Sequence, residues 1–255
     1  MADGEVKIKS LGKALRVLDC LVGQDEMGVT EIGEALGLGK SNVCDILSTF
    51  EAFGYVHQSQ RSGKYRLGYR VLELSHALSS SLGFRRTVYP HIKRLADSIN
   101  ETVYLGVPDD FDVIYLDAAY PGHESMTRSM LGDRAPMYCT GIGKAILSRL
   151  PEEKWQLLAG QPLKSYTAST ITSGEKLIGE LKETRERGYS IDNMEHEYGI
   201  RCVGVPLLNS QGAVVAGLSI SGPSLRMDDA RIEEYAGMLR AVAGELQPFA
   251  AFFGA

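Results

Sequence analysis

The stretch that decides the fold runs from Thr30 to Ala52 and reads TEIGEALGLGKSNVCDILSTFEA. Its apolar residues recur at helical spacing in two blocks, and Gly37 separates the blocks. The first block predicts a short helix with Thr30 as its N-cap and Gly37 at its end. The second block predicts a helix from Lys40 to Ala52. Two helices this close, joined by a tight turn, indicate a helix-turn-helix unit.

The flanking segments extend this unit on both sides. After Gly54, which is placed to stop the second helix, residues 55–59 and 64–67 are strand-like, and the polar turn 60–63 between them predicts a β-hairpin. Upstream, residues 11–22 carry an apolar stripe of helical period, made of Leu11, Leu15, Leu18, Leu21 and Val22. The order helix, helix, turn, helix, hairpin is typical of a winged helix-turn-helix, whose second motif helix enters the DNA major groove.

The rest of the chain predicts a second domain. Residues 69–80 read as a linker helix, and we divide the chain into 7–68 (winged helix-turn-helix), 69–83 (linker helix) and 84–255 (a second domain). The last part alternates helical segments (85–100, 140–150, 173–187, 228–253) with strand pairs (102–107 with 112–119, 202–208 with 214–221). Strands in hairpins with helices at both ends predict an α+β fold around a central antiparallel sheet.

The predicted second helix offers a polar face for reading DNA. If Val43, Ile46, Leu47 and Phe50 face the core, helical geometry turns outward Lys40, Ser41, Asn42, Cys44, Asp45 and Ser48. An asparagine pairs well with adenine, an aspartate accepts from the cytosine amino group, and a lysine suits a phosphate. A merely solvated helix face has the same composition. The preceding helix and the following hairpin favour DNA binding.

Positive charge gathers on the hairpin. Residues 57–70 contain Arg61, Lys64, Arg66 and Arg70 and no acidic residue. Residues 1–80 as a whole have 9 Lys/Arg and 10 Asp/Glu, a net charge of 9 − 10 = −1, so the domain is not basic overall. A single basic edge fits phosphate contacts that position the reading helix, and we expect Arg61 and Lys64 to make them.

The overall composition restricts the classes to which this protein can belong. The 255 residues are 44% hydrophobic and 23% charged, with a net charge of −5, which argues against nonspecific coating of nucleic acid. No apolar run approaches the length of a membrane span, and the N-terminus does not resemble a signal peptide, so we expect a cytoplasmic protein without membrane contact. The four cysteines form no Cys-x-x-Cys pair and the histidines are scattered, so we expect free thiols and neither a metal nor a cofactor.

Several short motifs, taken in order and spacing, resemble the IclR family of bacterial regulators over nearly the whole chain. They are the segments 9–18 (KSLGKALRVL), 39–43 (GKSNV), 63–68 (GKYRLG), 140–145 (TGIGKA), 187–192 (RGYSID), 199–203 (GIRCV) and 218–223 (LSISGP). The resemblance implies a GAF-like effector domain, homodimers that pair into tetramers, and a pseudo-palindromic operator. It also implies a dimer contact through the first helix and the linker helix. Many relatives have His-Arg where this chain has Cys44-Asp45, so the base preference of the relatives cannot be transferred to this protein.

The resemblance also implies an effector pocket at Gly141, Ile142, Asp192, Cys202, Ser219 and Ser221. Glycines allow a ligand carboxylate to approach the backbone closely, and hydroxyl and carboxyl groups can bind its other oxygens. Ser219 and Ser221 share one strand face, which a solvent-facing strand would also show. Met126 and Met130, with Leu131 and Met137, are candidates for apolar walls, although core packing explains methionines equally well. By analogy we expect a small organic acid or related metabolite as effector, and a repressor rather than an activator.

Two other functions compete with this interpretation. Gly141–Ala145 superficially resembles a phosphate loop. It lacks the G-x-x-x-x-G-K-[ST] spacing of that motif, and Ala145 stands where the motif has a serine or threonine. Cys202 could be the nucleophile of a thiol-dependent redox enzyme, yet no neighbouring residue in the sequence would lower its pKa. A GAF-like sensor that acts only as an interaction module, without DNA, conflicts with the N-terminal pattern. We therefore expect no enzymatic activity.

Overall fold

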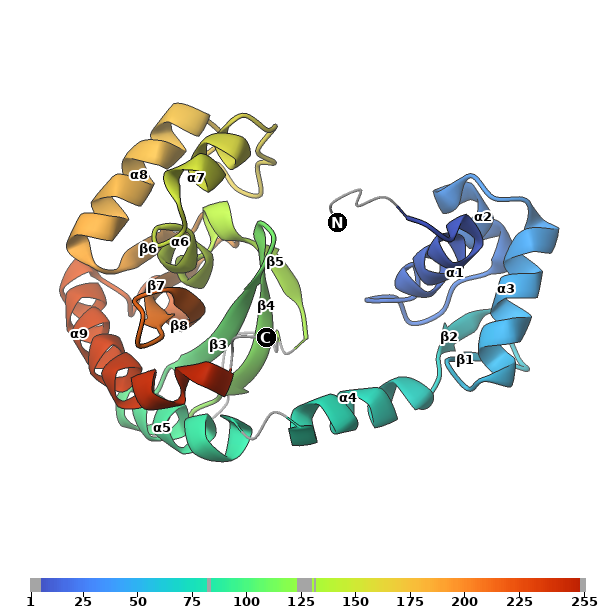
Figure 1. The fold of residues 1–255 in the computed structure, drawn as a ribbon, viewed down its shortest axis with the longest axis horizontal. Helices are drawn as coiled ribbons and strands as arrows, with labels where there is room; N and C mark the ends of the chain where they lie inside the picture. Colours follow the sequence, from blue (N-terminus) through green and yellow to red (C-terminus); the bar gives the residue numbers. More distant parts are fainter. Residues whose placement is uncertain (1–5, 82–83, 123–129, 131, 253–255) are drawn as a thin grey trace. The chain divides into compact units, whose positions relative to one another are not determined.

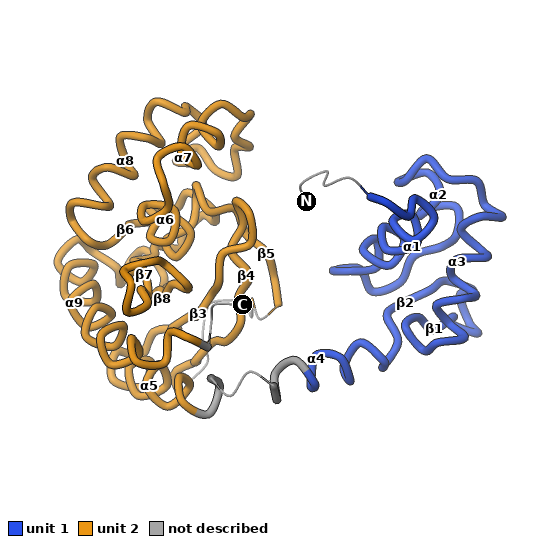
Figure 2. Tube along the Cα trace, in the orientation of Figure 1, with its two compact units in different colours: residues 1–82 blue, residues 83–255 orange. Residues whose placement is uncertain are grey.

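The computed structural model describes residues 6–81, 84–122, 130 and 132–252. The chain divides into two compact units, residues 1–82 and residues 83–255 (Figure 2). Each unit has its own hydrophobic core, so each is described by itself.

The first unit is a winged helix-turn-helix (Figure 1). Its elements are α1 (Lys9–Asp19), α2 (Val29–Leu36), α3 (Lys40–Ala52), β1 (Val56–Gln58), β2 (Tyr65–Leu67) and α4 (Arg70–Ser81). The two strands pair antiparallel, with His57 opposite Arg66, and Met27 adds a single bridge to Tyr65. Gly37 ends α2 in the left-handed conformation (φ 65°), as expected for a helix C-terminus. Buried residues from every helix but α4 meet in one core, composed of Val17, Leu21, Ile32, Val43, Leu47, Val56 and Tyr65.

One sequence prediction in this unit is wrong in detail. The N-cap of α2 is Gly28, not Thr30, because the Glu31 carboxylate accepts a hydrogen bond from the Gly28 backbone N–H at 2.6 Å and closes the helix start two residues earlier. The apolar stripe of α1 is buried only in part. Val17 is fully buried, whereas Leu11 and Leu15 are about half exposed, so the outer leucines of α1 face away from the unit's own core.

The second unit is built on a six-stranded antiparallel sheet of order β5-β4-β3-β8-β7-β6. The strands are β3 (Thr102–Asp109), β4 (Asp112–Ala119), β5 (Arg134–Pro136), β6 (Ser190–Asn193), β7 (Ile200–Leu208) and β8 (Val214–Pro223). The helices are α5 (Phe84–Ile99), α6 (Gly141–Leu147), α7 (Glu152–Ala159), α8 (Gly174–Arg187) and α9 (Asp229–Leu246), with 3₁₀ turns η1 (Met137–Cys139) and η2 (Gln247–Phe252). This is the predicted α+β class with a central antiparallel sheet.

Helices cover the sheet on both faces (Figure 1). On one face α6 lies so close to β7 that a Cβ on Gly204 would sit 2.4 Å from the Gly141 carbonyl oxygen, so both glycines are needed for the approach. Side chains alternate along β7, so Val203 and Val205 point to the opposite face, where α9 contacts the same strand and α5 contacts α9. The face under α6 is therefore the one that can hold a site between helix and sheet.

The structure corrects the end of one predicted helix and adds three elements that were not predicted. The last α-helix does not reach residue 253: it ends at Leu246 and continues as the 3₁₀ segment η2, because Pro248 has no N–H for a helical hydrogen bond. Residue 253 lies outside the described residues. Strands β5 and β6 and helix α7 have no counterpart among the predicted elements. The two strands are only three and four residues long, too short to show a hydrophobic period.

Candidate functional site

The predicted reading face lies on the surface of α3. All six residues proposed for it are exposed, namely Lys40, Ser41, Asn42, Cys44, Asp45 and Ser48. Val43 and Leu47 on the opposite side are fully buried, and Ile46 and Phe50 are partly buried. The helix is therefore held by one apolar side while its polar side chains, mostly near the N-terminus, are free to meet another molecule.

The hairpin is less purely basic in space than in sequence. Lys64 Nζ lies 2.9 Å from the Glu31 carboxylate of α2, and Arg70 pairs with Glu73 of α4. Ser62 at the turn donates to Glu26 at 2.6 Å. Glu31 and Glu26 are more than thirty residues away in the chain, so the sequence concealed that they lie beside the basic run. Arg61 at the turn is exposed.

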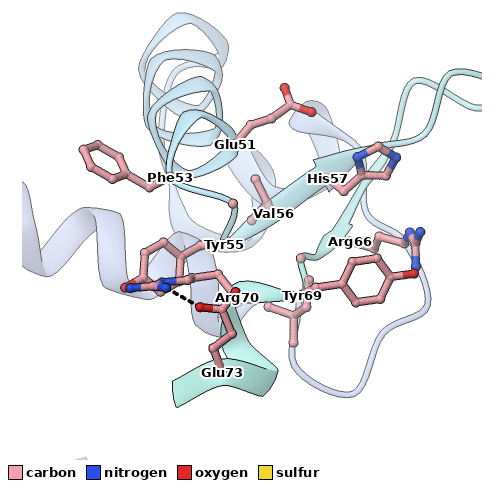
Figure 3. Close-up of a pocket in the computed structure, with 12 residues that line it drawn as sticks. Glu51, Phe53, Tyr55, Val56, His57, Arg66, Tyr69, Arg70 and Glu73 are labelled. Carbon is pink, nitrogen blue, oxygen red and sulfur yellow. Dashed lines mark hydrogen bonds and ion pairs between the residues drawn. The ribbon is translucent and has the colours of Figure 1, made fainter. Parts of the chain in front are cut away.

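A depression of about 650 Å³ lies on the outer side of the hairpin, away from the predicted reading residues. Figure 3 shows Tyr55, Arg70 and Glu73 on one side of it and Arg66 and Tyr69 on the other. The end of α3, both strands and the start of α4 supply its lining. This surface could not be predicted from the sequence, because it depends on how the hairpin meets α4.

In the second unit, the predicted effector residues that the structure describes converge on one pocket. Gly141 and Ile142 come from α6, Asp192 from β6, Cys202 from β7, and Ser219 and Ser221 from β8; Met130 also lines it. Met126 and Leu131 lie outside the described residues. Met137 belongs to the core and does not line the pocket. The pocket has a volume of about 40 Å³, so it is small in this conformation.

Six further residues line this pocket without having been predicted: Tyr104, Tyr115, Thr140, His196, Glu197 and Ile200. The rings of Tyr104 and Tyr115 meet edge to face with centroids 5.3 Å apart, on adjacent strands. The sequence indicated both tyrosines only as residues of a strand pair, because β3 pairs with β8, the strand of the two serines, only in the folded sheet, and β4 follows on the other side of β3. His196 and Glu197 follow β6, a strand that was not predicted.

Hydrogen bonds fix the polar lining. Ser221 Oγ donates to Cys202 Sγ at 3.1 Å, and the Asp192 carboxylate accepts from the Glu195 backbone N–H at 2.7 Å. Ser219 and Ser221 are both buried, so the strand face they share is not solvent-facing. Burial raises the pKa of the Cys202 thiol well above its usual value, the opposite of what an activated thiol nucleophile requires.

A buried charged cluster lies behind the pocket. The Lys144 ammonium, 1% exposed, pairs with Glu195 and lies 3.4 Å from the Glu180 carboxylate of α8. Although burial alone lowers the pKa of Lys144, Glu195 and Glu180 raise it above its ordinary value, so the lysine is charged. Burial, reinforced by Glu195, raises the pKa of Asp192 to about 7. The segment that follows β6 and carries Glu195 is thereby tied to α6 by an ion pair.

Neither a metal site nor a membrane-spanning helix is found among the residues that the structure describes. No group of three or more His, Cys, Asp or Glu side chains there is arranged to hold a metal ion. No helix within those residues is long and apolar enough to cross a membrane.

Comparison with known proteins gives both units the same relatives. Residues 10–60 match the model of the IclR helix-turn-helix domain, and residues 76–247 match that of the bacterial transcriptional regulator IclR C-terminal domain. The chain is 35% identical to the HTH-type transcriptional regulator KdgR of Escherichia coli over 94% of its length and 91% of the relative's. It is 30% identical to the transcriptional repressor IclR of the same organism, over 94% and 89%.

Solved structures share the whole fold. An IclR transcriptional regulator from Alicyclobacillus acidocaldarius superimposes with a TM-score of 0.85 at 27% identity, covering 97% of this chain and all of the other. An IclR homolog from Microbacterium hydrocarbonoxydans, complexed with 4-hydroxybenzoate, superimposes with a TM-score of 0.79 at 24% identity, covering 95% and 99%. The second likeness is one of fold.

Proposed function

The chain belongs to the IclR family of bacterial transcriptional regulators, and from that premise we propose that it represses transcription under the control of a small organic acid. DNA binding belongs to the family's helix-turn-helix domain, which residues 10–60 match. The effector, the direction of regulation and the residues that carry each step are the proposal.

The single observation that carries the effector proposal is the convergence of polar groups under α6. Six predicted residues from one helix and three strands line one pocket, and Asp192, Ser219 and Ser221 are buried there. Buried polar side chains cost stability unless they are satisfied, so a pocket lined by them is suited to a polar ligand. In about 40 Å³ the acid must be small, or the lining must move apart. A relative in fold that holds 4-hydroxybenzoate supports the class of ligand.

For DNA, we propose that Asn42 and Asp45 contact base edges and that Lys40 and Arg61 contact phosphates. Ser41, Cys44 and Ser48 complete the reading surface. Their exposure on α3 supports this assignment. Lys64 reaches a phosphate only by leaving Glu31, so we expect it to contribute less than Arg61.

We further propose that the protein binds a pseudo-palindromic operator as a homodimer, which can pair into a tetramer. Leucines of α1 and α4 that lie outside the unit's core support this: Leu11 is 53% exposed, Leu15 49%, Leu72 65% and Leu74 48%. Apolar side chains exposed in this number on two helices are typical of an interface.

The DNA proposal is tested by selecting binding sites from a random duplex library with the full-length protein. We expect an enriched site of approximate two-fold symmetry. Arg61→Ala should weaken binding to all sequences alike and lower the salt slope by about one unit. Selection that enriches no site would refute site-specific binding.

The effector proposal is tested by thermal shift against a panel of small organic acids, followed by measurement of operator affinity. Ser219→Ala should keep operator binding and lose the acid's stabilisation. Ser210→Ala, at an exposed serine in the turn between β7 and β8 that does not line the pocket, serves as the matched control. If no acid in the panel stabilises the wild-type protein, the proposed class of effector is wrong.

A further inference from the structure

We propose that the pocket under α6 takes a carboxylic acid together with one proton, and that Asp192 holds this proton. The inference rests on the proposed function for the class of ligand, and on the buried charges of the second unit for the proton. It concerns how an anion can bind among residues that are themselves acidic.

The first step is a count of buried charges. Asp192 and Glu195 are 3% and 5% exposed, and the Glu180 side chain is 20% exposed. Against these three carboxyl groups stand the buried ammonium of Lys144 and the Arg187 guanidinium, which lies 3.4 Å from Glu180. With every group ionised the cluster carries two positive and three negative charges. A buried unpaired charge is costly enough that the group takes up a proton instead.

The second step is to identify the carboxyl group that holds the proton. Glu180 pairs with Arg187 and lies near Lys144, and Glu195 pairs directly with Lys144. Asp192 has no ion pair with either cation and is bound instead by the Glu195 backbone N–H. The remaining proton therefore belongs on Asp192, and the rise of its pKa to about 7 agrees with this assignment.

Groups that titrate or carry charge face Asp192 from every element packed around it. They are Lys144 on α6, Glu195 beyond β6, Cys202 on β7, Tyr115 on β4 and Cys139 in η1, with Glu180 of α8 behind Lys144 and with His196 and Glu197 in the pocket lining. Burial raises the pKa of Cys202 and Tyr115 well above their ordinary values. It also raises the pKa of Cys139. These three groups are neutral, so none of them offsets a negative charge on Asp192.

The third step concerns the ligand. No lysine or arginine is among the described residues that line the pocket, and His196 is the one lining side chain there that can become cationic. An ionised Asp192 is 3% exposed and would repel an acid anion from a buried position, where charges interact more strongly than in water. A neutral Asp192 removes this repulsion, and its O–H can donate to a ligand oxygen. Acid anions should therefore bind the protonated pocket and raise its affinity for the proton in turn.

The proton is tested first without any ligand. At about pH 6 the infrared difference spectrum between wild-type protein and Asp192→Asn should contain the C=O stretching band of a protonated carboxyl group. The corresponding spectrum for Glu195→Gln should lack a band of that size, because the Glu195 carboxylate pairs with the Lys144 ammonium. Absence of the Asp192 band would overturn the assignment of the proton.

Coupling is tested by calorimetric titration with acetate, lactate and 4-hydroxybenzoate, each from about pH 6 to about pH 8.5. For an acid that binds, we expect a nearly constant affinity below about pH 7 and a fall approaching tenfold per pH unit above it. Asp192→Asn should bind with less than about a twofold change across this range. His196→Gln should keep the wild-type fall, which separates Asp192 from the imidazole in the lining.

The outcomes separate this inference from the proposed function. Binding of an acid whose affinity does not change with pH, without a carboxyl band from Asp192, overturns the proton and leaves the acid effector standing. A clear band with no binding of any of the three acids at pH 6 overturns the ligand class, and with it the coupling. If the fall of acid affinity with pH is lost in His196→Gln and kept in Asp192→Asn, the proton is on His196, and its assignment to Asp192 is wrong.

Discussion

The reading face of α3 and the pocket under α6 present their polar residues in opposite ways. On α3, Asn42 and Asp45 are exposed and contribute nothing to the core of their unit. Around the pocket, Asp192, Ser219 and Lys144 are buried and bound into the fold. A change on α3 should therefore alter recognition alone, whereas a change at the pocket alters recognition and stability together. Variants at the two places test this difference.

The largest effect is expected at Lys144. Lys144→Met leaves Glu195 buried without its cation, and losing one partner of a buried ion pair costs about 3–5 kcal/mol of unfolding free energy. Urea unfolding measures this loss. Lys182→Met, on the exposed side of α8, is the matched control and should change stability little. A loss at Lys144 no larger than that of the control would mean that the cluster is not buried as described.

The next effect depends on pH. Because the pKa of Asp192 is raised from 3.8 to about 7 in the folded state, folding favours its protonated form. Its contribution to stability is therefore complete below about pH 4 and is lost as pH rises toward 7. Asp192→Asn should become progressively more stable relative to wild type over this interval, by at most about 4 kcal/mol. Unfolding free energies at several pH values measure the difference, and a constant difference would contradict the raised pKa.

A smaller effect is expected where α6 meets the sheet. Gly204→Ala places a methyl group against the Gly141 carbonyl, which is backbone and cannot turn aside. Overpacking of this kind costs about 1–3 kcal/mol. Gly179→Ala has open space around its Cβ on α8 and should instead stabilise the protein by about 0.5–1 kcal/mol. Equal effects of the two changes would show that α6 is free to move off β7.

The smallest effect is confined to single base pairs. Asn42→Ala and Asp45→Ala should each cost about 1–3 kcal/mol at one position of the selected operator. They should leave the melting temperature unchanged, because both side chains are exposed. Binding to single-base variants of the operator measures the position. A uniform loss over all sequences would instead make these residues phosphate contacts.

The sequence predicted the elements better than their ends. Helical spacing located α3 with its bounds, and glycine located the end of α2, because both signals are local. The start of α2 was missed because a glutamate side chain, and not the residue before the helix, supplies the cap. The burial of Val17 rather than Leu11 was missed because spacing gives a helical period, while the partners that cover one face lie elsewhere in the chain.

The pocket was predictable only in part, and for a related reason. Family resemblance located Asp192, Cys202 and the two serines, and these residues do converge. Lys144 entered the sequence analysis only within a family motif and a failed phosphate-loop match, since nothing local shows that Glu195, 51 residues further on, pairs with it. Tyr104 and Tyr115 enter the pocket through strand order, which pairs β3 with β8 across more than a hundred residues.

The most direct test of the central claim, that the pocket controls DNA binding, is operator affinity with and without an acid that stabilises the protein. We expect that acid to change the operator affinity of the wild type by about tenfold, equivalent to about 1.4 kcal/mol of coupling. Ser219→Ala should bind the operator as tightly as the unliganded wild type and show no response to the acid. Equal responses in the two proteins, or an acid that stabilises the wild type without changing its operator affinity, would contradict it.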